Sequence, residues 1–446
     1  MTAGLLTLVR WLAQGALIGC LTGLSSAIFL YALERVTKLR LEHRALVFAM
    51  PLGGALVGLL YDRYGAPIRE GTNLVVRALR DDRVEVPTRM APMVLAGTLA
   101  THLVGGSAGR EGTAVQMGAS LAARVADELG MAPSSRRILL RAGVAGGFGG
   151  VFGTPIAGTV FALELARRDR VEAQALLPSL SAALVADAVV HGLGTNHGAY
   201  PLVAEIELRP GVLLAWLAFA TAVALVVAAF LWLTHAVKRV SERLSSKRSL
   251  RLALGGLAVA TVATVTRAED LLGLSEPVLE RALVDPTLPT ATFAAKLALT
   301  ALTLGAGFIG GEVTPLFVIG AALGNALAAP LGLPLTLAAM VGLVATFGAA
   351  AGTPFALAFM AAELGGAALL PHALLVTTAA SAMLGETTLY SARLDPEPTS
   401  TVHHAQGHER DARETAAEDD ARRSDAKPNQ QDAGCRTERE RDRVDE

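Results

Sequence analysis

Two glutamates lie inside glycine-rich segments of an otherwise apolar chain. The segment GGSAGREGT, residues 105–113, carries Glu111, and the segment GGEVTP, residues 310–315, carries Glu312. Ionisable side chains at membrane depth are costly and rare, and they are functional by default. A carboxylate can occupy a site for anions when it is ionised and leave that site when it is protonated. Each glutamate could therefore carry a proton and control an anion.

The residues around Glu111 predict a helix end that favours negative charge. Four glycines between Gly105 and Gly112 free the backbone, whereas Ala114–Ala126 has good helix-forming residues, so a helix should begin near Glu111. The unpaired N–H groups and the positive dipole end of such a helix attract anions. At an aqueous surface, Glu111 could simply complement the dipole or pair with Arg110. At membrane depth, we favour a functional role.

The second segment repeats this arrangement. Pro315 suits the first turn of a helix, and Thr314 can cap that helix or offer a hydroxyl to an anion. Glu312 is then a second buried carboxylate. Two carboxylates in one cavity oppose each other's ionisation, so one of them is protonated more readily. We expect a proton relay with two stations, Glu111 and Glu312.

The composition indicates that the elements holding these residues lie in a bilayer. The chain has 446 residues, 18% of them charged, and a mean hydropathy of +0.45. Long apolar runs recur, many of them broken by glycine or proline, and they predict an all-α polytopic membrane protein. Examples are Leu5–Leu33, Leu213–Val237, Leu252–Val265 with its flanks, and Leu335–Ala351. No basic stripe with interleaved aromatics indicates nucleic acid.

The cysteines and histidines do not suggest metal or disulfide chemistry. The two cysteines, Cys20 and Cys435, fall in an expected span and in a polar segment. The nine histidines are scattered without the spacing of metal ligands. We therefore expect no metal and no cofactor.

A change of composition near residue 395 divides the chain. Residues 395–446 are rich in charge and poor in large apolar side chains, which predicts a disordered cytoplasmic tail. Residues 1–394 form the expected transmembrane domain, with halves of about 1–192 and 211–394. Basic clusters at Arg167–Arg170 and Lys238–Arg251 flank apolar runs, and the positive-inside rule places them on the cytoplasmic side. We expect an inner-membrane protein with cytoplasmic termini.

The two halves share an internal repeat. Gly143–Glu164 and Gly342–Glu363 agree at nine of 22 positions, including a Gly-Thr-Pro turn and the closing glutamate. The segments that carry Glu111 and Glu312 also correspond, at an offset of 202 residues. Halves that are each broken in the corresponding place predict an inverted-repeat transporter whose site lies where the broken helices meet. A tightly packed bundle of small residues is the alternative explanation, and the charges inside the repeats argue against it.

These motifs resemble those of the CLC family of chloride channels and anion/proton antiporters. Gly109–Thr113 is similar to the family's Gly-Arg-Glu-Gly-Pro motif, whose Glu is the external gate and proton carrier. Gly311–Pro315 resembles its Gly-Ile-Phe-Ala-Pro motif. Leu389–Ala392 resembles the segment whose Tyr hydroxyl touches the central anion. The likeness spans about residues 5–393 and implies a CLC-type inverted repeat of tilted and broken helices that assembles as a homodimer.

Three departures resemble the fluoride/proton antiporter branch of that family. The chloride motif Gly-Ser-Gly-Ile-Pro is replaced by Gly71–Val75, in which Thr72 stands where many members of the branch have Met. The Ile-Phe-Ala triplet is replaced by Glu312-Val313-Thr314. The paired glutamates of proton-coupled chloride members are reduced to Glu164-Leu165, so the inner proton station is missing, a loss that the fluoride branch tolerates.

The resemblance implies a full set of site residues. The gate and proton carriers would be Glu111 and Glu312, and no residue would be catalytic. The anion-binding residues would be Gly71, Thr72, Asn73, Arg110, Gly112, Val313, Thr314 and Tyr390. Fluoride is small and strongly hydrated, so such a site must replace water by several short hydrogen bonds from N–H and O–H donors.

Four other polar residues are expected to have structural roles. Lys296 is expected to snorkel to an interface, and His102 to be hydrogen-bonded within the fold. Glu164 and Glu363 lie at equivalent helix ends, where a helix cap or a cytoplasmic ion pair is expected.

The sequence therefore predicts a secondary transporter and no enzyme. We expect fluoride export against proton entry, with fluoride, protons and membrane lipid as partners and no nucleic acid. A chloride or broad-halide transporter or channel of the same fold is the alternative, because Thr72 keeps a hydroxyl. A more remote alternative is an intramembrane enzyme that uses Glu111 and Glu312 as acid and base.

Overall fold

The described part of the chain is almost entirely helical, as the sequence predicts. The computed structural model describes residues 2–166, 173–195, 198–203 and 210–393. These residues contain sixteen α-helices, several short 3₁₀ turns and no strand. Arg167–Arg170 and the charged segment 395–446 lie outside the described residues.

The helices fall into two series that match in order. The first comprises α1 (Thr2–Glu42), α2 (Met50–Tyr64), α3 (Thr72–Ala78), α4 (Met90–Leu103), α5 (Glu111–Glu128), α6 (Pro133–Phe152), α7 (Pro155–Leu165) and α8 (Leu176–Gly192). The second comprises α9 (Pro210–Leu244), α10 (Arg248–Val265), α11 (Glu276–Val284), α12 (Thr292–Ala306), α13 (Val313–Ala328), α14 (Leu335–Ala351), α15 (Pro354–Gly365) and α16 (Leu369–Leu384). The repeat pairs α5–α7 of the first series with α13–α15 of the second.

The shared Gly-Thr-Pro motif breaks a helix in the same way in both series. Gly153 ends α6 with a φ of 72°, and Gly352 ends α14 with a φ of 65°. Only glycine adopts this left-handed conformation without strain. The following proline then opens α7 or α15, where its missing N–H costs nothing. The motif therefore encodes a sharp turn between two helices.

The glutamates at the ends of α7 and α15 cap each other's helix. Glu363 accepts hydrogen bonds from the N–H groups of Ile156 and Ala157, both at 2.8 Å. Glu164 accepts them from Phe355 at 3.3 Å and from Ala356 at 2.9 Å. The prediction that these residues cap helices is confirmed. A reciprocal contact of this kind indicates that a pseudo-two-fold axis relates the two halves.

Small residues let the paired helices approach each other closely. A Cβ added to Gly118 of α5 would collide with the carbonyl oxygen of Gly143 in α6. A Cβ added to Gly320 of α13 would collide with the carbonyl oxygen of Gly342 in α14. The repeat thus preserves a pair of glycine contacts, and side chains at these positions would separate the helices.

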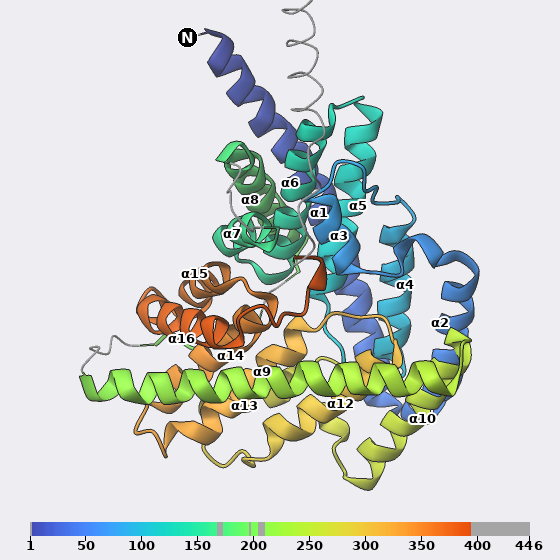
Figure 1. The fold of residues 1–446 in the computed structure, drawn as a ribbon, viewed down its shortest axis with the longest axis vertical. Helices are drawn as coiled ribbons and strands as arrows, with labels where there is room; N and C mark the ends of the chain where they lie inside the picture. The colour runs from blue at the N-terminus through green and yellow to red at the C-terminus, as the bar shows by residue number, and fades with distance from the viewer. Residues whose placement is uncertain (1, 167–172, 196–197, 204–209, 394–446) are drawn as a thin grey trace, which may run out of the picture. The chain divides into compact units, whose positions relative to one another are not determined.

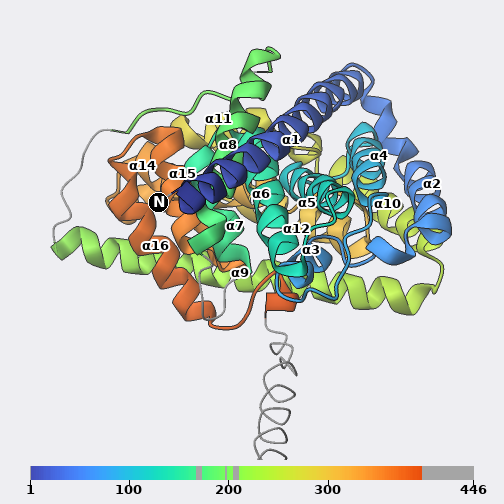
Figure 2. The same ribbon diagram turned by 90° about the horizontal axis from the view of Figure 1, so that it is seen from above.

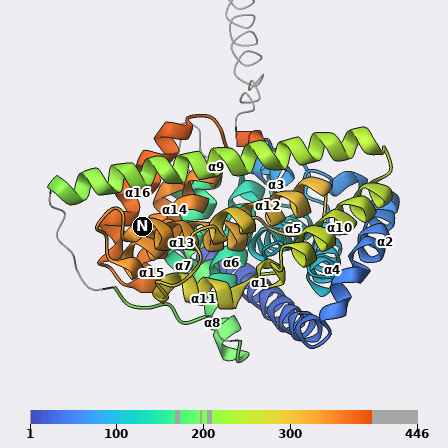
Figure 3. The same ribbon diagram turned by 90° about the horizontal axis from the view of Figure 1, so that it is seen from below.

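Two long helices frame this core. In Figures 1 and 3, α9 lies across α12, α14 and α16 along one face of the helical assembly. In Figure 2, α1 crosses the assembly beside α6 and α8. Both helices cover the broken helices, which hold the site between them.

Six described helical segments are long and apolar enough to cross a bilayer. They are Gly4–Glu42, Arg44–Tyr64, Ala173–Gly192, Pro210–Leu244, Arg248–Val265 and Ala367–Leu384. The sequence predicts a further span at Leu335–Ala351. It forms α14, a shorter helix that is buried from Leu337 onward and belongs to the core.

The glycine contact between α13 and α14 predicts the effect of one added methyl group. Gly320→Ala should destabilise the protein by about 1–3 kcal/mol, because the new Cβ meets a backbone oxygen that cannot move freely. Thermal unfolding in detergent measures this effect. Gly211→Ala is the control, since no atom lies within 4 Å of its added Cβ. Equal melting temperatures for the two variants would contradict the prediction.

Candidate functional site

The two glycine-rich segments meet at the centre of the described chain. Gly109 and Gly311 form an antiparallel bridge, in which the Gly109 N–H donates to Gly311 at 2.6 Å and the Gly311 N–H donates to Gly109 at 2.8 Å. Each segment leaves its preceding helix through a glycine of positive φ, Gly105 at 92° and Gly307 at 103°. The bridge brings together the N-terminal ends of α5 and α13, one from each half.

The side chain of Glu111 reaches across this bridge to the other half. Its carboxylate accepts hydrogen bonds from the Thr314 N–H at 3.2 Å and from the Thr314 hydroxyl. It also accepts the N–H of Arg110 at 3.1 Å. Only 1% of Glu111 is exposed. A negative group is thus held by N–H and O–H donors at two helix N-termini, and an anion could be held in the same way.

Arg110 lies between Glu111 and an acidic residue of α11. Its Nε is 3.6 Å from Glu111 Oε1, and its Nη1 donates to Glu276 Oε1 at 3.2 Å. The Arg110 side chain is one-fifth exposed and Glu276 is half exposed, so the pair faces the outer edge of the site. Arg110 therefore balances the charge of Glu111 from one side.

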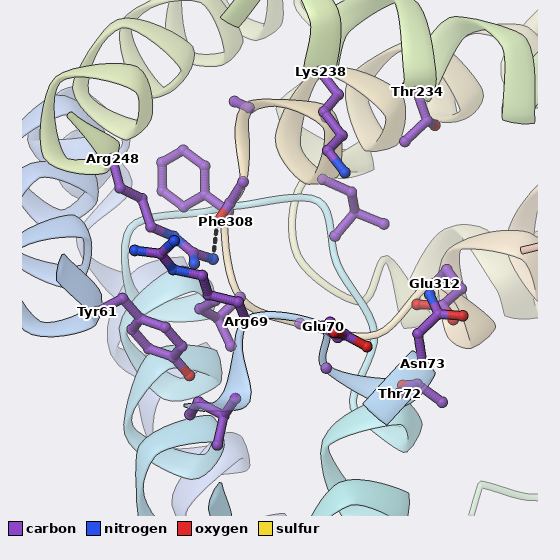
Figure 4. Close-up of a pocket in the computed structure, with 18 of the residues that line it drawn as sticks. Tyr61, Arg69, Glu70, Thr72, Asn73, Thr234, Lys238, Arg248, Phe308 and Glu312 are labelled. Carbon is purple, nitrogen blue, oxygen red and sulfur yellow. Dashed lines mark hydrogen bonds between the residues drawn. The ribbon is translucent and has the colours of Figure 1, made fainter. Parts of the chain in front are cut away.

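Glu312 lies on the opposite side of the bridge, at the wall of a large cavity. The cavity has a volume of about 910 Å³ and is open to the surface. A hydrogen bond joins the side chain of Glu312 to Tyr390. Figure 4 shows Glu312 close to Asn73 and Thr72. The second carboxylate thus faces a polar cavity, whereas Glu111 is enclosed.

The α3 segment is tied to its surroundings through polar side chains. The Asn73 Oδ1 accepts the N–H of Ala392 at 3.0 Å, which fixes the chain that carries Tyr390. The Thr72 Oγ1 accepts a hydrogen bond from Gln116 Nε2 of α5 at 3.2 Å. Each of the two α3 side chains thus accepts a hydrogen bond from another part of the chain.

The expected gate, proton-carrying and anion-binding residues separate into two groups. The residues that line the cavity are Gly71, Thr72, Asn73, Glu312 and Tyr390. Those that do not line it are Glu111, Arg110, Gly112, Val313 and Thr314, which cluster at the helix ends. A Cβ on Gly112 would lie 3.2 Å from Gly311 Cα and 3.8 Å from Thr72 Oγ1. A side chain at Gly112 would therefore press against Gly311 and lie between the two groups.

Several basic side chains line the cavity. Lys238, Arg248 and Arg69 come from α9, from α10 and from the segment before α3, and they can be followed in Figure 4. Arg248 donates to the carbonyl of Gly307 at 3.2 Å, which ties the cavity wall to the end of α12. Acidic side chains line the same cavity, so its lining carries both signs of charge. The sequence analysis uses Lys238 and Arg248 only to predict topology and assigns no role to Arg69.

Lys296 does not snorkel to an interface. It is fully buried, and its Nζ donates to the carbonyls of Leu271 and Gly273 and to the Ser275 hydroxyl, all at 2.9 Å. Three protein acceptors replace water, which allows the ammonium group to remain inside the fold. Because Ser275 directly precedes Glu276, Lys296 fixes the segment that presents the partner of Arg110.

His102 has the structural role that the sequence predicts. Its Nδ1 lies 2.9 Å from the Thr98 carbonyl oxygen, and its Nε2 lies 3.0 Å from that of Ala108. The imidazole thus connects α4 to the residue before Gly109. This contact fixes the approach of the chain to the central bridge.

Sequence reasoning missed two residues of the site, Gln116 and Glu276. Gln116 is a long polar residue among small and apolar neighbours in α5, and this contrast was the available signal. Glu276 lies 166 residues from Arg110 in the chain, and nothing local marks their pairing.

Comparison with known proteins agrees with this arrangement. Residues 53–385 match the protein family described as voltage gated chloride channel. A chloride/fluoride channel protein from Pseudomonas syringae pv. tomato is 38% identical over 392 residues, which cover 86% of each chain. The crystal structure of a CLC-type fluoride/proton antiporter superposes with a TM-score of 0.83 at 33% identity and covers 86% of this chain and 98% of its own.

A second solved structure shares the fold at lower identity. It is a slow cyanobacterial Cl⁻/H⁺ antiporter, with a TM-score of 0.76 and 19% identity, covering 86% of this chain and 97% of its own. At this identity, the likeness supports the arrangement of helices alone.

The buried ammonium group of Lys296 yields a stability prediction. Lys296→Met should strongly lower the melting temperature in detergent, because each buried acceptor left unpaired costs about 1–3 kcal/mol. Lys38→Met is the control, since Lys38 forms an exposed pair with Glu34, worth about 0–1 kcal/mol. A Lys296→Met protein as stable as the control would show that the three contacts contribute little.

Proposed function

This chain belongs to the voltage gated chloride channel family, or CLC family, and we propose that it is a fluoride/proton antiporter that exports fluoride against proton entry. Membership of this family supports the general function, which is halide transport by a polytopic membrane protein. The choice of fluoride and of proton coupling is our proposal. It describes a secondary transporter and no enzyme.

The observation that carries the proposal is the position of the Glu111 carboxylate. It is enclosed among hydrogen-bond donors from both halves of the protein, where an anion could replace it. An ionised Glu111 would occupy the anion site and block passage. A protonated Glu111 loses its attraction for these donors and leaves the site to an anion. Because one side chain would alternate between the two roles, proton and anion would move in exchange.

Glu312 would supply the second proton station. It faces the cavity and is hydrogen-bonded to Tyr390, whereas Glu111 lies beyond Gly112. A proton could pass from the enclosed carboxyl group to the one that water can reach. This relay would replace the inner glutamate, whose place is taken by Leu165.

Fluoride is supported by the hydrogen-bonding groups of the site and by two of the similar proteins. Thr72, Thr314 and Tyr390 each carry a hydroxyl, and a protonated carboxyl group adds a further O–H donor. Short charge-assisted hydrogen bonds are what a small anion needs in exchange for its water. The solved fluoride/proton antiporter and the chloride/fluoride channel protein are named for fluoride transport.

A chloride or broad-halide transporter of the same fold is the second candidate. The observation in its favour is Thr72, whose buried hydroxyl lines the cavity and could also donate to chloride. The two functions differ in the ratio of fluoride to chloride flux, which one assay measures.

We also propose a homodimer in the cell inner membrane with both termini on the cytoplasmic side. The helices α7, α8, α15 and α16 leave large apolar side chains exposed, including Ile156, Leu184, Phe355, Phe359 and Met383. Such a face suits lipid or a second copy of the chain. The basic residues between Lys238 and Arg251 support the cytoplasmic placement of the cavity mouth.

One prediction of the proposed function concerns Glu111. Proteoliposomes loaded with fluoride or chloride should release fluoride under an inward proton gradient and release little chloride. Glu111→Gln should abolish the coupling, because an amide cannot carry the proton. Glu128→Gln, at the exposed far end of the same helix, should transport as the unaltered protein does. Equal chloride flux from the unaltered protein would replace our proposal by the broad-halide function.

Another prediction of the proposed function concerns Glu312. Glu312→Gln keeps the size of the side chain and an acceptor for Tyr390 but removes a proton station. Proton-coupled fluoride flux should fall by roughly a hundredfold, a typical contribution of one proton-transfer group. Fluoride binding to the protein in detergent should be largely retained. Unchanged coupled flux in this variant would exclude Glu312 from the relay.

A further inference from the structure

Arg110 is a charged partner of the Glu111 carboxylate, and it has a second carboxylate as well. Its Nε lies 3.6 Å from Glu111 Oε1, and its Nη1 lies 3.2 Å from Glu276 Oε1. Glu111 is buried, whereas the Glu276 side chain is half exposed. One guanidinium charge is therefore shared between an enclosed carboxylate and a carboxylate that stays in contact with water.

An arginine in this position opposes protonation of the gate. A cation close to a carboxylate favours the ionised form, and the attraction is strong where water is excluded. With Arg110 as its sole charged partner, Glu111 would resist protonation and remain in the anion site. A second carboxylate on the same guanidinium weakens this hold in two ways, because it neutralises part of the positive charge and adds a negative charge nearby.

The backbone before Glu276 is held in an unusual conformation. Ser275 has a φ of 61°, in the left-handed region that residues other than glycine rarely adopt. Its hydroxyl accepts a hydrogen bond from the buried Lys296 Nζ at 2.9 Å and donates one to the Leu272 carbonyl at 3.3 Å. A strained conformation persists only where its surroundings enforce it, and such strain gathers at functional sites. The fold thus holds Glu276 at the start of α11, within reach of Arg110.

The other charged groups near α11 face water or other partners. Neither α13 nor α14, which pack against α11, carries a charged side chain. On α11 itself, Arg281 pairs with Asp285, and Glu280 is exposed one turn after Glu276. Charged groups on and beside the turn before α11 line a small pocket together: Arg40, Arg44, Glu269 and Asp270.

Tyr200 is a neutral neighbour of the shared guanidinium. Its side chain packs against the core, and its hydroxyl interacts electrostatically with Arg110, Glu111 and Glu276. Burial raises the pKa of Tyr200 to about 12, against a smaller opposing effect of Arg110, so the phenol is uncharged at physiological pH. Across the bridge, Glu312 also acts on Glu111. Glu276 is thus the group that both contacts Arg110 and is reached by water.

We propose that Glu276 is a positioning residue for the gate: it takes part of the Arg110 charge and thereby keeps Arg110 from holding Glu111 in its ionised, closed state. This inference rests on the proposed function and names a residue that sets the pH at which its gate opens. Glu276 acts on Glu111 through the guanidinium that the two carboxylates share.

The variant Glu276→Gln removes the charge but keeps the size of the side chain and an oxygen that can accept from Arg110. The full attraction of Arg110 then acts on Glu111, so protonation of Glu111 requires a more acidic solution. In proteoliposomes, the pH of half-maximal fluoride efflux should fall by roughly one unit, the low end of the effect of one nearby charge. Glu276→Asp keeps the charge and should keep the midpoint close to that of the unaltered protein.

A titration without transport tests the same effect. Infrared difference spectra of the full-length protein in detergent follow the C=O band of protonated carboxyl groups as the pH changes. The band that is missing in Glu111→Gln belongs to Glu111, and its midpoint should be lower in Glu276→Gln by the same amount. Glu280→Gln is the matched control and should leave the midpoint unchanged, because Glu280 is exposed on the same helix and forms no ion pair with a described residue.

Three results would overturn the proposal. One is a Glu276→Gln protein whose melting temperature and midpoint both equal those of the unaltered protein. Another is a midpoint that moves to higher pH. The third is an equal shift in Glu280→Gln, which would indicate a general effect of surface charge. Fluoride efflux without proton coupling in the unaltered protein would contradict the proposed function, whereas the infrared titration would still test Glu276.

Discussion

The paired backbone hydrogen bonds between Gly109 and Gly311 are the constraint on which the rest of the site depends. They place two helix N-termini side by side, and they tolerate no side chain. A Cβ on Gly311 would lie 2.8 Å from the Gly112 nitrogen, and one on Gly109 would lie 2.9 Å from the Glu111 carboxylate. The glycines that sequence inspection notes as flexible are thus required for close approach. Because the two backbones touch, one carboxylate can reach donors from both halves.

Three charged groups near this bridge each have a charged or hydrogen-bonding partner. Glu111 is held by donors of Arg110 and Thr314, and Arg110 is shared with Glu276. Lys296 holds the loop before Glu276 through three acceptors. A buried charge costs several kcal/mol unless it is paired or hydrogen-bonded, so each group depends on the next.

Much of the fold around the site could be predicted from the sequence, because the features that define it depend on residues close together in the chain. The glycine-rich segments, the helix that starts at Glu111 and the repeated Gly-Thr-Pro turn all depend on neighbours within a few positions. The sequence could not reveal how Lys296 is satisfied, since its acceptors lie 21 to 25 residues away, in a loop whose course no periodicity defines. Nor could the sequence predict the contact between Gln116 and Thr72, because that contact depends on the position of α5 along its axis relative to α3. The sequence thus predicts where helices begin and which residues are functional. It does not predict which residues of different helices and loops come into contact.

The helices α7 and α15 are each capped by a glutamate from the other half, and this affects the order in which the protein can fold. Glu363 is synthesised 207 residues after Ile156, whose N–H it accepts. At ordinary translation speeds, this interval lasts on the order of 10–40 s. During that time, the start of α7 has no carboxylate to satisfy it, although its proline and helix are already made. The first half is thus an incomplete folding unit until the second half has been made. The starts of α7 and α15 can both be capped only once α15 has left the ribosome.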